Sequence, residues 1–208
     1  NQPISRRSVG APTSLRSLFS PDRFSSEGPL LDVLYLVAME ERNAIIEIRD
    51  AKLEDAGRLL EIYDHYVRHT AISFEYETPT LAAFQERMRE TMRRYPYLVI
   101  LRDGRIEGYA YAGPFVGRAA YGWSCETTIY LDQAARKCGL GRRIYEALEG
   151  ELRQMGILNM YACIGVPEQE DEYLTMNSAD FHVHLGFVKV GTFHRCGCKF
   201  DRWYNMVW

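Results

Sequence analysis

The segment from Glu126 to Tyr145 holds the residues whose types and spacing say most about chemistry. Thr127 to Tyr130 is a β-branched run that predicts a strand, and Arg136, Gly139 and Gly141 follow it in the spacing R-x-x-G-x-G. An amphipathic helix is expected directly after the glycines. A helix N-terminus offers free backbone N–H groups to an anion, and glycine lets that anion approach closely. The segment therefore predicts a phosphate or pyrophosphate site.

Two other phosphate-binding motifs do not match this turn. The P-loop string G-x-x-x-x-G-K-[ST] does not occur in the sequence. The dinucleotide motif G-x-G-x-x-G lacks its third glycine, because Arg142, Arg143 and Ile144 follow Gly141. The turn also follows the fourth predicted strand, whereas that motif follows the first. The remaining possibility is the R/Q-x-x-G-x-G/A turn of transferases that use acyl-CoA.

The composition limits the class of protein. The chain has 208 residues, which suits one domain, and 47% of them are hydrophobic, which is enough for a core. The net charge of −3 argues against a general nucleic-acid binder, since such proteins carry a basic excess. No apolar run reaches the ~18–20 residues that span a bilayer. We therefore expect neither nucleic acid nor a membrane as a partner.

The cysteines bear on compartment and on metal binding. Their number, 5, is odd and no signal peptide is visible, so we expect reduced thiols and a cytoplasmic protein. Cys196-Gly-Cys198 lies near His194, but zinc sites usually add a second ligand pair to the first. We expect no bound metal, and free thiols in or beside a C-terminal hairpin. The cysteines are Cys125, Cys138, Cys163, Cys196 and Cys198.

Residues 1–44 differ in composition from the rest of the chain. Residues 1–29 carry four arginines, four prolines and many serines, with only Asp22 and Glu27 as acids. This composition predicts a disordered leader, with an organelle-targeting segment as the alternative. Met39 is a candidate for the natural start. We assign the folded domain to residues 45–208.

Hydrophobic periodicity divides residues 45–208 into strands and helices. Asp103-Gly104 between two apolar runs predicts a tight hairpin turn. Thr80 is expected to cap a helix whose Leu81, Phe84 and Met88 face inward. The predicted strands are 45–49, 97–101, 106–112, 126–131, 158–166, 187–193 and 203–207, and the predicted helices start at 53 and 80 or cover 140–154 and 177–185. This order predicts an α+β fold, a mixed sheet with helices on its faces.

Four sequence blocks carry a resemblance to a known family, in order and at fitting distances. They are Tyr111 to Pro114, Ala120 to Glu126, Arg136 to Arg143, and Asn177-Ser178 followed by His182 and Leu185 to Phe187. Through these blocks, residues 45–208 resemble the GNAT acetyltransferase superfamily, and within it the phosphinothricin and methionine sulfoximine N-acetyltransferase branch. The resemblance implies the GNAT fold, with a mostly antiparallel mixed central sheet and helices on both faces, and acetyl-CoA as the cofactor.

The resemblance implies a site for coenzyme A along the fourth strand and the glycine turn. Cations at a helix N-terminus are unfavourable unless an anion is present, which supports a phosphate there. Asn177 would bond the pantetheine arm, although asparagine at a helix start is also an ordinary N-cap. The pantetheine would bond backbone groups of Ile129, Tyr130 and Leu131, and the pyrophosphate would lie on Lys137, Cys138, Gly139, Leu140, Gly141, Arg142 and Arg143, with added charge from Arg136.

Two side chains are the implied catalytic groups. Acetyl transfer needs an uncharged amine and a protonated leaving thiolate. Glu126 stands where this branch places the carboxylate that deprotonates the amine, often through water; the alternative is a surface glutamate at a strand end. His182 stands where relatives protonate the thiolate or relay the proton; the alternative is a structural histidine on a helix face.

The acceptor pocket is expected to be aromatic. Arg118 could pair with a substrate carboxylate, although an exposed loop arginine is the simpler interpretation. The acidic loop 167–173 is longer than in similar proteins, so it could repel anionic acceptors and puts phosphinothricin in doubt as a substrate. The aromatic candidates are Phe74, Tyr76, Tyr111, Tyr121 and Trp123.

These observations favour an N-acetyltransferase that moves the acetyl group of acetyl-CoA directly to the primary amine of a small amino-acid-like molecule, in a ternary complex. A covalent route through Cys125 is the mechanistic alternative, but strand alternation turns Cys125 away from Glu126. Acetylation of protein or peptide N-termini and a non-catalytic acyl-CoA sensor are the alternative functions. Dimers are common among similar proteins, so a homodimer is expected by analogy alone.

Overall fold

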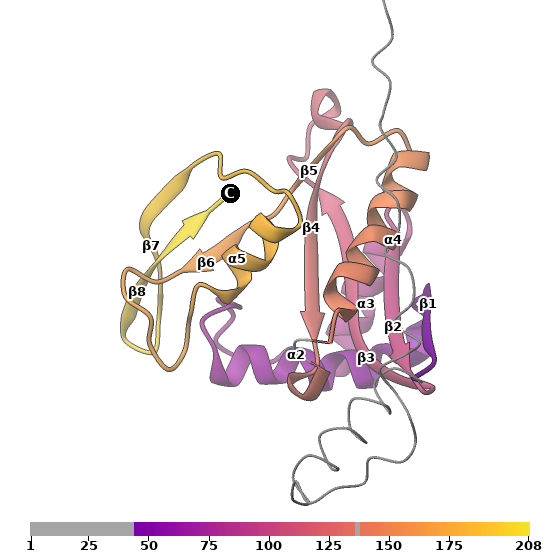
Figure 1. Ribbon diagram of the computed structural model, residues 1–208, viewed down its shortest axis with the longest axis horizontal. Coiled ribbons are helices and arrows are strands. Elements are labelled where there is room, and N and C mark those ends of the chain that lie inside the picture. Colours follow the sequence, from indigo (N-terminus) through magenta and orange to yellow (C-terminus); the bar gives the residue numbers. More distant parts are fainter. Residues whose placement is uncertain (1–43, 136–137) are drawn as a thin grey trace, which may run out of the picture. The chain divides into compact units, whose positions relative to one another are not determined.

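Two β-sheets organise the chain in the computed structural model, which describes residues 44–135 and 138–208 (Figure 1). The first sheet has the order β1 (Ile46–Asp50), β2 (Tyr97–Arg102), β3 (Arg105–Pro114), β4 (Ser124–Leu131) and β5 (Asn159–Tyr161). Its neighbours are antiparallel except β4 and β5, which are parallel. The second sheet is antiparallel, with the order β6 (Ile164–Val166), β8 (Arg202–Val207) and β7 (Thr192–Lys199).

Helices cover both faces of the first sheet, as the α+β prediction requires. On β2, Tyr97, Val99 and Leu101 pack with α2 (Ala56–His69) and α3 (Leu81–Met92). The alternate residues, Leu98 and Ile100, pack with α4 (Leu140–Gln154), which Figure 1 shows in front of the sheet. Successive side chains of a strand point to opposite faces, so an unbroken apolar strand can supply both cores.

Local signals placed several elements correctly. The Thr80 side chain accepts a hydrogen bond of 3.2 Å from the Ala83 N–H and so caps α3 as predicted. Phe84 and Met88 are buried, but the expectation for Leu81 is wrong, since it is 46% exposed at the first residue of the helix. Asp103 and Gly104 have φ of 51° and 80°, the left-handed conformations of a tight hairpin turn.

The strand predicted over 158–166 is two strands. Residues 159–161 form β5, which pairs with β4 over Ser124–Glu126, and residues 164–166 form β6, which pairs with β8 of the second sheet. The apolar run continues through Ala162 and Cys163, so its composition did not reveal where the chain changes sheets. Beyond Glu126, β4 pairs with β3 alone within the described chain, and one edge of its backbone is left open.

The final hairpin also lies later than predicted. The strand expected at 187–193 is β7, residues 192–199, because the tight turn falls at Phe200 and Asp201, with φ of 53° and 59°. The segment before it follows α5 (Asn177–His184) and exposes Val188 and Val190. The predicted leader lies outside the described residues except for Ala44, so the domain boundary stays a prediction.

Candidate active site

A cavity of about 390 Å³ lies at the open edge of β4, and we call it the β4 cavity. Segments distant in the sequence meet there: β4, the chain between α2 and α3, the link from β5 to β6, and α5. A volume of this size suits a small ligand. Its wall consists of Tyr63, Ile72, Ser73, Phe74, Glu75, Tyr111, Glu126, Thr127, Thr128, Ile129, Tyr130, Ala162, Cys163, Ile164, Gly165, Ser178, His182 and Met206.

Glu126 lies in this wall at the start of β4. It is half-buried, and burial raises the pKa of its carboxyl group because the charged form loses hydration. Its neighbour Cys125 points to the other face and is buried in the core beneath α4. Burial raises the pKa of the Cys125 thiol to about 11. Glu126 is thus the side chain of this pair with access to a ligand, and it is suited to accept a proton.

His182 also lines the cavity, but both of its ring nitrogens have partners. Nδ1 lies 2.7 Å from the backbone oxygen of Ser178, and Nε2 lies 2.9 Å from the Tyr145 hydroxyl. A backbone oxygen only accepts, so Nδ1 carries a proton and the Nε2 atom of the neutral ring accepts one from Tyr145. Burial lowers the pKa of His182, which is 5% exposed.

The hydrogen-bond chain continues from His182 into β4. The Tyr145 hydroxyl lies 3.0 Å from Oγ1 of Thr127, which also donates to the Tyr161 backbone oxygen at 3.1 Å. If Nε2 gains a proton, the Tyr145 hydroxyl can turn and donate to Thr127 instead. The chain can therefore accommodate either protonation state of His182, and it joins α5, α4 and β4 next to Glu126.

The glycine turn has the backbone geometry that an anion site needs. Gly139 has a φ of 78°, a conformation that side chains with a Cβ rarely adopt. A Cβ on Gly141 would lie 3.0 Å from the Phe181 ring, so the close packing of α4 on α5 requires glycine there. The Arg143 N–H bonds Gly139 O at 3.3 Å, and the amides of the first three helical residues, Leu140 to Arg142, have no intrahelical acceptor.

The charged residues around this turn are only partly described. Arg136 and Lys137, predicted to add charge there, lie outside the described residues. Arg142 and Arg143 are exposed, and Arg142 pairs with Glu146 at 3.9 Å and donates to His184 O at 3.1 Å. Cys138 is half-buried, and its sulfur donates to Ala135 O at 2.7 Å.

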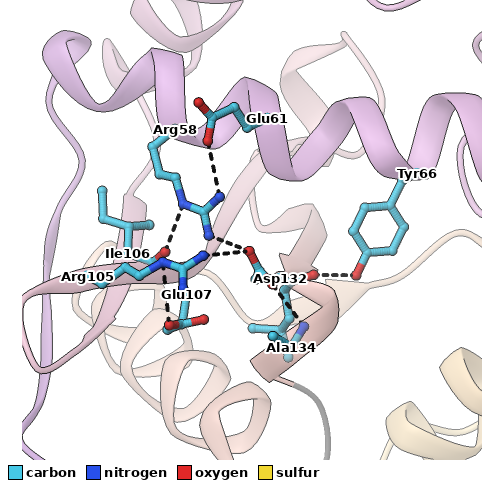
Figure 2. A network of polar contacts seen from close by, with 9 residues as sticks. Arg58, Glu61, Tyr66, Arg105, Ile106, Glu107, Asp132 and Ala134 are labelled. Atoms are coloured by element: carbon cyan, nitrogen blue, oxygen red, sulfur yellow. Dashed lines mark hydrogen bonds and ion pairs between the residues drawn. The ribbon is translucent and has the colours of Figure 1, made fainter.

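A network of polar contacts anchors the end of β4 that leads into the turn (Figure 2). The Asp132 carboxylate pairs with the Arg58 guanidinium of α2, lies 3.6 Å from Nη2 of Arg105, and accepts the Ala134 N–H at 2.9 Å. Burial works to raise the pKa of Asp132, but the Ala134 N–H and Arg58 outweigh it and the pKa is lowered. The carboxylate is therefore held charged at the entrance to the turn.

Backbone contacts reinforce this anchor. The Asp132 N–H donates to Glu107 O at 2.7 Å, and the Tyr66 hydroxyl donates to Leu131 O at 2.6 Å. Of the predicted pantetheine residues, Ile129 and Tyr130 line the β4 cavity, whereas Leu131 does not and its carbonyl already accepts from Tyr66.

Of the other predicted site residues, some line the β4 cavity and others are exposed outside its wall. Phe74 and Tyr111 line the β4 cavity. Asn177 is exposed, and it is not the N-cap of α5, because Met176 occupies that position. Four predicted acceptor contacts are exposed and outside the cavity wall, and one of them, Tyr76, donates its hydroxyl to Cys198 O at 2.8 Å. The four are Tyr76, Arg118, Tyr121 and Trp123.

Several wall residues escaped the sequence analysis. Thr128 shares the strand face of Glu126 at a spacing of two, and this signal could have found it. Glu75, Ser73 and Cys163 arrive from segments far from β4, and nothing in their local pattern indicates a shared cavity. Burial raises the pKa of the Cys163 thiol to about 12, with Glu126 adding to the effect.

The described residues were compared with the requirements of a metal site. Among residues 44–135 and 138–208, no group of three or more His, Cys, Asp or Glu side chains could hold a metal ion. Cys196 and Cys198 lie on β7, in the hairpin where they were expected.

A larger hollow of about 680 Å³ lies between α4 and the segment after α5, but Glu126 and His182 are not in its wall.

Comparison with known proteins identifies the family of the chain. Residues 48–208 match the model of the acetyltransferase (GNAT) domain family. The chain is 30% identical to a phosphinothricin N-acetyltransferase of Streptomyces viridochromogenes, over 77% of this chain and 84% of the relative. It is 31% identical to an L-methionine sulfoximine/L-methionine sulfone acetyltransferase of Salmonella typhimurium, over 77% of this chain and 90% of the relative.

A solved structure extends the comparison to the cofactor. The crystal structure of a GNAT superfamily phosphinothricin acetyltransferase from Sinorhizobium meliloti, in complex with AcCoA, superposes with a TM-score of 0.71. It is 31% identical in sequence and covers 78% of this chain and 85% of that one. The chain therefore belongs to the GNAT acetyltransferase family and is an N-acetyltransferase that uses acetyl-CoA.

Proposed function

We propose that this enzyme acetylates the primary amine of a small amino-acid-like molecule by direct transfer in a ternary complex, with Glu126 as the base. The observation that carries the proposal is the Glu126 carboxyl group, whose pKa burial raises, in the wall of a cavity of about 390 Å³. Relatives named for phosphinothricin and methionine sulfoximine support an amino-acid-like acceptor. The size of the cavity favours such a molecule over a peptide.

The residues present fit coenzyme A, which supplies an acetyl thioester when bound. The open edge of β4 after Glu126 offers backbone groups to an extended arm, and Ile129 and Tyr130 lie at the cavity. The amides of Leu140, Gly141 and Arg142, which have no acceptor within the helix, would receive the pyrophosphate at the positive end of α4. We include Arg136, Lys137, Cys138, Gly139, Arg143, Leu131 and Asn177 in this site, as the resemblance implies.

Glu126 removes a proton from the acceptor ammonium, directly or through a water molecule. Bound acetyl-CoA would supply the thioester carbon: the neutral nitrogen would form the C–N bond as the C–S bond breaks, the nitrogen would lose its second proton to solvent, and the released thiolate would take up one proton. A base is most effective when its pKa lies near the working pH, so the burial of Glu126 serves the reaction. Glu126 must be ionised to act, so activity falls as the pH drops through its raised pKa.

We assign His182 to the protonation of the thiolate, as donor or relay. In the neutral ring Nε2 carries no proton and accepts from Tyr145 at 2.9 Å, so His182 has to take up a proton on Nε2 before it can pass one on. Giving that proton away leaves the ring neutral, the form that burial favours and that accepts from Tyr145. Tyr145 thereby keeps the ring oriented in both states.

The cysteines support direct transfer. Cys125 is buried beneath α4, away from the β4 cavity, and its thiol has a pKa of about 11. Cys163 lines the cavity but has a pKa of about 12, so both thiols stay protonated at neutral pH. The thiolate is the nucleophilic form of cysteine, so neither residue is suited to carry an acetyl group.

The proposal includes the setting of the enzyme. We assign catalysis to residues 45–208, and we propose a cytoplasmic homodimer that uses neither nucleic acid nor metal. Of the described helices, none is long and apolar enough to cross a membrane.

A thiol-release assay with acetyl-CoA and a panel of amino acids, amino-acid analogues and peptides tests the proposal. We expect acetylated product from free amino acids or their analogues, confirmed by mass spectrometry. Release no faster than hydrolysis with every amine would favour an acyl-CoA sensor. Turnover restricted to peptides would replace the small-molecule proposal with N-terminal acetylation of peptides.

A further inference from the structure

Glu75 brings a second carboxylate to the β4 cavity. It lies in the segment between α2 and α3 and belongs to the cavity wall. Its Oε1 accepts a hydrogen bond of 2.7 Å from Nη1 of Arg87, whereas Oε2 is buried without a hydrogen-bond partner in the described chain. The side chain as a whole is 35% exposed, so a ligand can reach this carboxylate, and a group that donates to Oε2 would give it the hydrogen bond it lacks.

The charges of the wall are all of one sign. Glu75 and Glu126 are its acids, and no lysine or arginine lines the cavity within the described residues. Arg87 reaches Glu75 from outside the wall, and Arg118 is exposed elsewhere. The remaining polar wall residues are hydroxyl groups, the Cys163 thiol and a histidine whose neutral form burial favours. An anion on the side chain of the acceptor would find no cation in the wall, whereas a cation there would find Glu126 and Glu75, of which Glu75 is already paired with Arg87 at 2.7 Å.

The segment that carries Glu75 is held in place by a buried lysine. Lys199 of β7 is 2% exposed, and its ammonium group donates to the backbone oxygens of Val67, Thr70 and Ser73 at 2.7, 2.8 and 2.6 Å. These three bonds use all three of its protons. The Glu75 N–H in turn donates to Oγ of Ser73 at 3.3 Å. Glu75 is therefore presented by a segment that is fixed before any ligand arrives.

We propose that the acceptor carries a cationic nitrogen in addition to the amine that is acetylated, and that Glu75 binds this second cation. A basic amino acid or a diamine has this chemistry, whereas phosphinothricin would bring a phosphinate anion to an acidic wall. The inference rests on the proposed function, because it takes the β4 cavity as the acceptor site. It assigns Glu75 to specificity and leaves proton removal to Glu126.

Three amino acids of similar size test the proposal: lysine, norleucine and 2-aminoadipate, whose side chains end in a cation, a methyl group and an anion. The measured quantity is kcat/KM with saturating acetyl-CoA. We expect lysine to exceed norleucine by about 10- to 100-fold, the usual value of a hydrogen bond to a charged group, with 2-aminoadipate lowest. Glu75→Gln keeps the size of the side chain and should bring the ratio of the kcat/KM values for lysine and norleucine down to about one.

Glu77→Gln is the matched control, because Glu77 is exposed and outside the cavity wall. It should leave the order of the three substrates unchanged. The specificity proposal is overturned if norleucine or 2-aminoadipate is preferred, or if the preference for lysine survives in Glu75→Gln with normal thermal unfolding. If none of the three is acetylated while other amino acids or analogues are, the specificity proposal is overturned; failure with every amine of the panel would instead overturn the proposed function.

Discussion

The carboxylates near the two ends of β4 differ in whether they have partners within the protein. At the Leu131 end, the Asp132 carboxylate has Arg58, Arg105 and the Ala134 N–H as partners, and its pKa is lowered (Figure 2). At the other end, burial raises the pKa of Glu126, and one oxygen of Glu75 has no partner in the described chain. A charge with internal partners stabilises the fold, whereas a charge without them is available to a ligand.

This difference matches the proposed division of labour along the strand. The Asp132 end leads into the glycine turn, which in the proposed site would hold the same diphosphate in every catalytic cycle. A rigid, internally paired anchor suits that task because it needs no rearrangement on binding. As the proposed base, Glu126 at the other end would take up and release a proton, which a fully paired carboxylate would do poorly.

The largest effect is expected at the unpaired end. Glu126→Gln should lower kcat by about 10²–10⁴-fold, because a positioned base is lost, and should abolish the acid limb of the pH–rate profile. The dissociation constant of acetyl-CoA, measured by calorimetry, should stay within about twofold of the wild type. Glu168→Gln in the exposed acidic loop is the control and should keep the full rate. An acid limb that persists in Glu126→Gln would show that another group is the base.

The glycine turn should respond in binding rather than in chemistry. Gly139→Val forces a β-branched residue to a φ of 78°, where strain costs about 1–3 kcal/mol. We expect acetyl-CoA to bind about 10-fold more weakly or worse by calorimetry. Gly150→Ala, within α4, should leave the affinity unchanged, because a Cβ there meets nothing within 4 Å and φ is ordinary. Equal affinities for both variants would separate the turn from the cofactor site.

A change at the Asp132 end of β4 should lower the stability of the fold. Asp132→Asn removes the charge that pairs with Arg58, which keeps only Glu61, and the Asp132 and Arg58 side chains are 17% and 24% exposed. We expect the free energy of unfolding in urea to fall by about 1–2 kcal/mol, less than for a fully buried pair. Asp201→Asn in the exposed β7–β8 turn should be neutral. If Asp132→Asn unfolded with the same free energy as the wild type, the partners of Asp132 would not stabilise the fold, contrary to the comparison of the two ends of β4.

The smallest effect is a difference in the pH dependence of stability. The pKa of Asp132 is lowered on folding, so its contribution to stability is present at neutral pH and lost as the pH falls through its folded pKa. The pKa of Glu126 is raised, so its charged form opposes folding at neutral pH and this penalty disappears on acidification. Glu126→Gln should therefore be up to about 1 kcal/mol more stable than wild type at pH 7, with the gap closing as the pH falls through the raised pKa of Glu126. Urea unfolding at several pH values measures it, and a gap that widens on acidification contradicts the assignment.

The features that the sequence predicted well are local ones. The glycine turn, the helix from Leu140, the Asp103-Gly104 hairpin and the opposite orientation of Cys125 and Glu126 all follow from neighbouring residues. Each depends on backbone dihedral preferences, capping or strand alternation within a few positions. The four resemblance blocks extended these local signals to a family and a cofactor.

The tertiary structure alone decided which side chains share the β4 cavity and which charges lack partners. The apolar run 158–166 has no marker for its division between two sheets, yet that division opens the edge of β4. In the sequence, Glu75 does not differ from other loop glutamates. In the structure, Lys199 holds its segment in place, and Glu75 shares a cavity wall with Tyr111 and Glu126. Dihedral preference is encoded residue by residue, whereas desolvation depends on the whole packed surroundings of an atom, which distant segments provide only after folding.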